Sequence, residues 1–72
     1  MKVFEVLNSV KFSNETENEV IITKDDVVYI FGVTDVGDLF NFLDVKDFSE
    51  KFITEEYKGG LDVTRHQLRI LV

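Results

Sequence analysis

Residues 19–33 have the sequence EVIITKDDVVYIFGV, in which two runs of β-branched and aromatic residues stand on either side of a short polar break. Such runs favour β-strands, because branched and aromatic side chains pack well on a pleated surface. Lys24, Asp25 and Asp26 form the break, so the stretch predicts an antiparallel hairpin over 19–33. The break contains no Asn-Gly or Asp-Gly pair, which leaves the type of turn open.

Both faces of this hairpin are apolar. A strand with one face in water alternates apolar and polar residues, and the second run does not. Val27, Tyr29 and Phe31 point to one face of the sheet. Val28 and Ile30 point to the other, so both faces need cover from the N-terminal segment or from a second subunit. We expect a homodimer through the sheet face or edge, because twofold pairs are the commonest oligomers.

Two helices are predicted after the hairpin. Apolar residues spaced i, i+3, i+4 and i+7 predict a helix over 35–44, and a similar stripe predicts a second helix over 47–58. Asp47 and Glu50 have the spacing of a capping box at the start of the second helix. The pair Gly59-Gly60 suits its end, because glycine readily adopts the left-handed conformation of a helix stop.

The two ends of the chain complete the predicted fold. Residues 63–72 are rich in branched residues and predict a strand. Residues 2–11 fit an amphipathic helix, but their apolar residues also partly alternate as in a strand, and both alternatives stay open. The predicted fold is therefore one α+β domain over 1–72. It has an antiparallel sheet of about three strands (the hairpin 19–33 and the strand 63–72) and two consecutive helices (35–44 and 47–58).

Composition limits the kind of protein. The 72 residues suffice for one domain, and 44% of them are hydrophobic, including seven Phe, which is too apolar for a disordered acidic tail. We find no signal peptide and no run long enough to cross a membrane, and we expect a cytoplasmic protein. The formal net charge of −6 disfavours direct binding to nucleic acid.

The sequence offers little for catalysis or for metal binding. It has no Cys and one His, which excludes disulfides, thiolate sites and multi-histidine sites within one chain. His66 stands beside Arg65 and near Arg69 without a nucleophile motif, and we expect a histidine at the surface or at a strand edge. We therefore predict that the protein is not an enzyme and needs no cofactor or metal.

Acidic residues gather between positions 35 and 56, and one Phe lies off the apolar stripe of the predicted helix 35–44. The plainer interpretation is that the acids cap helices and solvate their outer faces. The functional interpretation is a small acidic binding module that occupies a basic, nucleic-acid-binding surface of a partner protein. Bacterial and phage accessory or inhibitor proteins have this general composition, and a phage protein would act in the host cytoplasm; the alternative is a self-assembling protein. The predicted partner-binding residues are Asp35, Asp38, Phe42, Asp44, Asp47, Glu50, Glu55 and Glu56.

Overall fold

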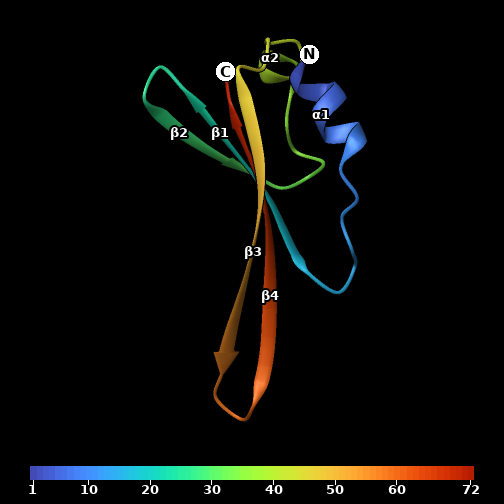
Figure 1. Ribbon diagram of the computed structural model, residues 1–72, viewed down its shortest axis with the longest axis vertical. Helices are drawn as coiled ribbons and strands as arrows, with labels where there is room; N and C mark the ends of the chain where they lie inside the picture. Colours follow the sequence, from blue (N-terminus) through green and yellow to red (C-terminus); the bar gives the residue numbers. More distant parts are fainter.

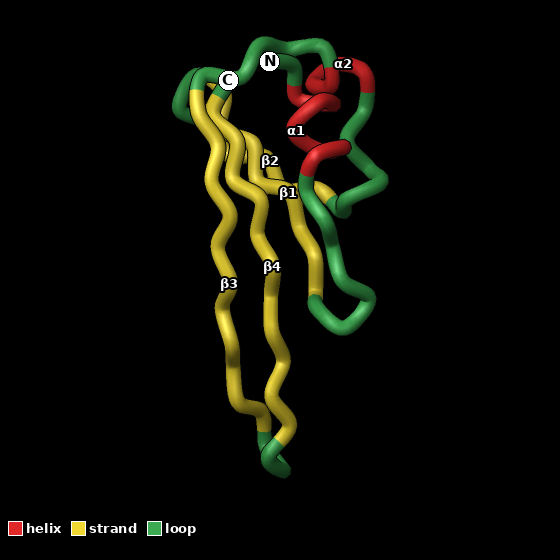
Figure 2. Tube along the Cα trace, turned by 45° about the vertical axis from the view of Figure 1, so that its right-hand side comes forward, coloured by secondary structure: helices red, strands yellow, loops and turns green.

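The computed structural model describes residues 1–72 as one four-stranded mixed sheet with two short helices (Figures 1 and 2). The predicted α+β class is confirmed, and the detail differs. The strands lie side by side in the order β2-β1-β4-β3, with a parallel pair in the centre and an antiparallel pair on each side. The elements are α1 (Val3–Ser9), β1 (Glu17–Lys24), β2 (Val27–Phe31), α2 (Asp38–Asn41), β3 (Asp47–Tyr57) and β4 (Leu61–Leu71).

The predicted hairpin is confirmed as the antiparallel pair β1–β2, with Lys24 opposite Val27. Its two-residue turn consists of Asp25 and Asp26, which both have positive φ angles (51° and 65°). Two successive positive φ values define a type I′ turn, whose twist matches that of the flanking strands. Asp tolerates this left-handed conformation better than most residues, so the turn forms without glycine.

The predicted C-terminal strand is confirmed as β4, but it pairs with β1 in parallel, with Val20 beside Leu68 and Ile22 beside Ile70. The expectation of a purely antiparallel sheet is therefore wrong. Parallel neighbours need a long connection between them. Here β2, α2 and β3 all lie between β1 and β4 in the chain, and local sequence does not report such a distant pairing.

The predicted helix over 47–58 is wrong, because these residues form β3, which pairs with β4 along its whole length. Phe48 and Phe52 are four residues apart, a spacing that places them on one face of either a helix or a strand. In the sheet they lie opposite Ile70 and His66. The following glycines have φ angles of 95° and 78° and form the loop of a hairpin rather than the end of a helix.

Of the predicted helix over 35–44, only the single turn of α2 is helical. The helical alternative for 2–11 is confirmed as α1. Gly37 precedes α2, and the Asn41 side chain donates a hydrogen bond from Nδ2 to the carbonyl oxygen of Val36 (2.8 Å). Neither helix has the length or the apolar character required to cross a bilayer.

The core lies on one face of the sheet, which α1 and α2 cover (Figure 2). The opposite face, which we call the open face, has no element over it. The one-sided core explains why the structure buries only ten of the 72 residues. Its eight hydrophobic members are Val3, Val6, Val20, Ile22, Val36, Phe40, Leu68 and Ile70.

Candidate functional site

Helices α1 and α2 lie together at the end of the sheet that also holds both chain termini (Figure 1). We call this region, with residues 42–46, the helical end. Backbone hydrogen bonds join its parts: the Val3 amide donates to the Leu43 carbonyl (3.1 Å), and the Val45 amide donates to the Met1 carbonyl (2.8 Å). The helical end is therefore a fixed platform for its side chains.

Large apolar side chains are exposed on this platform. Leu39 is 82% exposed and Phe42 is 61% exposed, and the Phe42 ring packs edge-on against Phe4 with the centroids 5.7 Å apart. The spacing had placed Leu39 in the apolar stripe of a longer helix. It is exposed because α2 is one turn long and buries only Phe40.

Acidic side chains stand on either side of Phe42 in the chain. Asp38 occupies the first turn of α2 and is exposed. The Asp44 carboxylate forms an ion pair with Lys2, whose Nζ lies 2.7 Å from Asp44 Oδ1. The hydrogen bond and the positive charge of Lys2 lower the pKa of Asp44 below its usual 3.8. The helical end thus presents exposed apolar side chains together with the carboxylates of Asp38 and Asp44.

The structure does not bring all the predicted partner-binding residues together. Asp38, Phe42 and Asp44 lie at the helical end, and Asp35 lies in the loop before α2. Glu56 lies roughly 30 Å along β3 from the first residue of that strand, at about 3.3 Å per residue. Of the others, Asp47 and Glu55 belong to the open face, and Glu50 belongs to the helix-covered face.

Glu50 contacts the histidine that the sequence had placed at the surface. His66 is 2% exposed, and its Nε2 lies 2.8 Å from Glu50 Oε1. Its ring lies between those of Phe12 and Phe52, with centroid distances of 4.8 and 4.2 Å. The expectation of a surface or strand-edge histidine is wrong, because β4 is a central strand and this position faces the helix-covered side. His66 is a packing residue with one hydrogen bond to a carboxylate.

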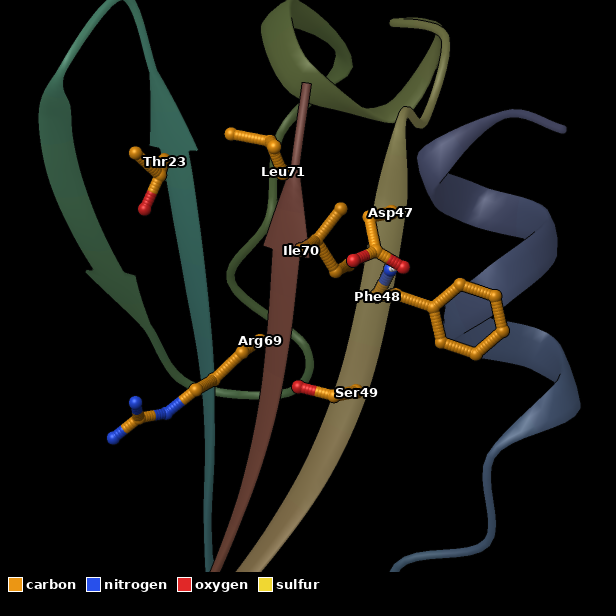
Figure 3. Close-up of a pocket in the computed structure, with 7 residues that line it drawn as sticks. All are labelled: Thr23, Asp47, Phe48, Ser49, Arg69, Ile70 and Leu71. Atoms are coloured by element: carbon orange, nitrogen blue, oxygen red, sulfur yellow. Dashed lines mark hydrogen bonds between the residues drawn. The ribbon is translucent and has the colours of Figure 1, made fainter.

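The open face carries a second feature, an apolar one. Ile30 of β2 lies beside Ile21 of β1, and Thr23 of β1 lies between Val28 of β2 and Leu71 of β4. We call Ile21, Val28, Ile30 and Leu71 the apolar corner. A shallow depression of about 180 Å³ adjoins Leu71. Figure 3 shows Thr23, Leu71 and Arg69 on one side of it and Asp47 and Ser49 on β3, whereas the ring of Phe48 points to the α1 side.

The rest of the open face is polar and internally bonded. Gln67 donates a hydrogen bond from Nε2 to Glu19 and accepts two from Arg69 (3.2 and 2.9 Å). Arg65 lies between Glu17 (3.6 Å) and Glu55 (3.9 Å), and the negative charge of Glu55 is the main cause of its raised pKa. These side chains largely satisfy one another.

The pockets are small and shallow, and no three His, Asp or Glu side chains converge as metal ligands would. The most apolar pocket measures about 210 Å³ and lies between Tyr29 of β2 and Leu39, Phe40 and Leu43. Cofactor sites are usually larger, at about 300–1,000 Å³. The chain matches no family model, no curated protein and no solved structure. The features to be explained are therefore two surfaces, the helical end and the open face.

Proposed function

We propose that this protein is a non-catalytic binding module that docks its helical end on a basic surface of a partner protein. The observation that carries the proposal is the pair of exposed apolar side chains, Leu39 and Phe42, on the same helical end as Asp38 and Asp44. Aromatic anchors dominate the energy of protein interfaces, and charged groups around them set specificity and association rate.

The charge of the protein supports a basic partner. A net charge of −6 on 72 residues attracts a basic surface and repels an acidic one. Surfaces that bind nucleic acid are strongly basic, because they neutralise phosphates with Lys and Arg. The module would therefore act as an inhibitor that competes with nucleic acid, in the cytoplasm of a bacterium or of a phage-infected host.

The experiment begins with a photo-crosslinking residue at position 42, on the helical end, and in a second preparation at position 56, near the tip of the β3–β4 hairpin. We expect position 42 to capture a basic protein and position 56 to capture nothing specific. The captured protein is then purified, and its affinity for the unmodified chain is measured.

Substitutions test the site on the purified pair. Phe42→Ala is expected to weaken binding by about 2 kcal/mol, a roughly 30-fold increase in Kd, as for an interface hot spot. Asp38→Lys should slow association, and the loss should shrink as salt rises from about 0.05 to about 0.3 M. Glu56→Lys makes the same charge change away from the helical end and serves as the matched control.

Two results would contradict the proposal. One is that Phe42→Ala and Asp38→Lys bind as well as the Glu56→Lys control. The other is a partner whose captured surface is acidic or apolar and whose nucleic-acid binding is unaffected by the module.

A further inference from the structure

The four residues of the apolar corner lie at two successive levels of the open face, around Thr23. The strand register places Ile21 directly beside Ile30, and Thr23 between Val28 and Leu71. Val28 is 58% exposed and Ile30 is 66% exposed. Single exposed apolar residues scattered over a surface are normal. A cluster of exposed branched residues on a sheet, in contrast, indicates an interaction surface.

Nothing in the single chain covers this corner. Both helices pack on the other face of the sheet, where the core takes up only eight hydrophobic side chains. A chain of this size gains marginal stability from such a core, and association that buries more apolar surface is one of the usual remedies.

Two opposite charges on the same face have no ionic partner within the chain. Arg69 donates only to the neutral Gln67 side chain, and no carboxylate forms an ion pair with it. The Asp47 carboxylate accepts only from the backbone amide of Phe48 (2.9 Å). Both side chains line the depression that adjoins Leu71 (Figure 3).

This pairing of a free cation and a free anion identifies the occupant. In a twofold interface residue i contacts residue j and residue j contacts residue i, so a surface that binds itself must carry both members of each charge pair. A purely basic surface could pair with Asp47 but would leave Arg69 without an ionic partner. A second copy of the chain would pair its own Asp47 with Arg69 and its own Arg69 with Asp47.

We propose that two copies of this chain pack open face against open face through the apolar corner. The proposed twofold axis runs perpendicular to the strands, between the level of Thr23 and the level of Ile21, and it places Val28 over Ile30 of the second copy. It also brings Arg69 beside Asp47 of the second copy, because these two residues lie on neighbouring strands at successive levels of the open face. Packed sheets lie about 10 Å apart, a gap that these side chains span.

The required contact is compatible with the size of the molecule. A stable interface takes about 800 Å² from each partner. This is about one-sixth of the accessible surface of 5162 Å². The apolar corner with the neighbouring Arg69, Gln67 and Ser49 side chains extends over all four strands.

The first test is the mass in solution by sedimentation equilibrium. We expect the full chain to have twice its 8.3 kDa mass at micromolar concentration. Val28→Lys with Ile30→Lys should raise the dimer dissociation constant by roughly 100-fold or more, since the two positions meet across the axis twice. Both side chains are exposed in the single chain, and circular dichroism should show an unchanged fold.

The second test is a charge exchange. Arg69→Asp alone and Asp47→Arg alone should each weaken the dimer by at least tenfold, because each leaves two like charges together. The double variant should recover most of the lost affinity, which a purely structural effect of either substitution would not produce.

A matched control separates this proposal from the proposed function. Leu39→Lys with Phe42→Lys changes two exposed apolar residues at the helical end and should leave the dimer intact. A chain that stays monomeric at about 1 mM would overturn face packing. So would a dimer that persists in the Val28→Lys, Ile30→Lys variant, or a charge exchange that fails to restore association.

Discussion

Asp25 and Asp26 form the tightest turn of the sheet, and both hold left-handed backbone angles. A non-glycine residue in this conformation costs roughly 1–2 kcal/mol, less for Asp than for most residues. Glycine removes this cost but loses more freedom on folding, by about 0.5–1 kcal/mol. The effect of replacing Asp26 by glycine on stability therefore depends on which of these two free-energy costs is larger.

Asp26→Gly is therefore expected to raise the free energy of unfolding by about 0.5 kcal/mol, because it creates the Asp-Gly pair preferred in type I′ turns. Asp26→Ala removes the same charge but keeps a Cβ at a positive φ, and it should lower stability. Urea unfolding of both variants measures the difference. Equal stability of the Gly and Ala variants would contradict the turn assignment.

The Lys2–Asp44 ion pair connects the start of α1 to the loop after α2. Lys2 lowers the pKa of Asp44, so the folded state binds this proton less tightly than the unfolded state does. The pair therefore stabilises the fold at pH values above the usual 3.8, and this stabilisation is lost as the pH falls through the lowered pKa.

Carboxyl-carbon NMR should give a titration midpoint for Asp44 below 3.8 in the unmodified protein. Lys2→Gln should return the midpoint towards that value, because it removes both the hydrogen bond and the charge. Lys24→Gln removes a cation that pairs with Asp25 instead and should leave the midpoint unchanged. A midpoint that is indifferent to Lys2 would show that the ion pair is not formed in solution.

At the scale of elements, the β3–β4 hairpin is unusual in extending well beyond its neighbours (Figure 1). Strand β1 pairs with β4 only from Arg65 to Leu71, and residues 61–64 contact β3 alone. The outer hairpin is thus a two-stranded ribbon, which is marginally stable in water.

Hydrogen exchange should reveal this gradient along a single strand. Amides of residues 62–64 are expected to exchange by local fraying, with opening free energies near zero. Those of residues 66–70 lie between two strands and should approach the global unfolding free energy. The inner part of β4 is the internal reference, and uniform protection along β4 would contradict the expected fraying.

Local pattern predicted the hairpin β1–β2, the C-terminal strand and one of the two alternatives for α1. It failed for β3, because Phe48 and Phe52 satisfy helical and extended periods alike. The deciding factor is the partner strand β4, whose pairing with Asp47–Tyr57 satisfies backbone groups that a helix would have satisfied internally. The parallel β1–β4 contact joins residues too distant for any local rule.

The sequence pattern likewise indicated some residues of the candidate surfaces and missed others. Phe42 lies off the helical stripe, which indicated a surface position. The two-sided hairpin indicated that both faces need cover, but it did not show that α1 would pack on the same face as α2. Leu39 fits the apolar spacing of the predicted helix 35–44 but is exposed, because the spacing does not show that α2 ends after one turn. The order of the acids in the chain likewise did not reveal that a strand would carry Glu56 far from Asp38.

At the scale of the whole molecule, the layering is one-sided and the shape is elongated, with extents of 42, 24 and 18 Å. Both helices lie on one face of the sheet, so the other face stays free. The core is small, and other apolar residues are therefore exposed on the helical end and on the open face. The outer edge strand β3 is long, but it carries charged side chains such as Lys51 and Glu56. Such charges discourage unwanted strand pairing at an exposed edge.

Because both helices occupy the same side of the sheet, two chains joined back to back would direct their helical ends in opposite directions. Such a pair would be a bivalent ligand. It would bind an oligomeric basic partner with an avidity far above that of a single contact, provided that the spacing of the partner's basic surfaces matches the span of the pair.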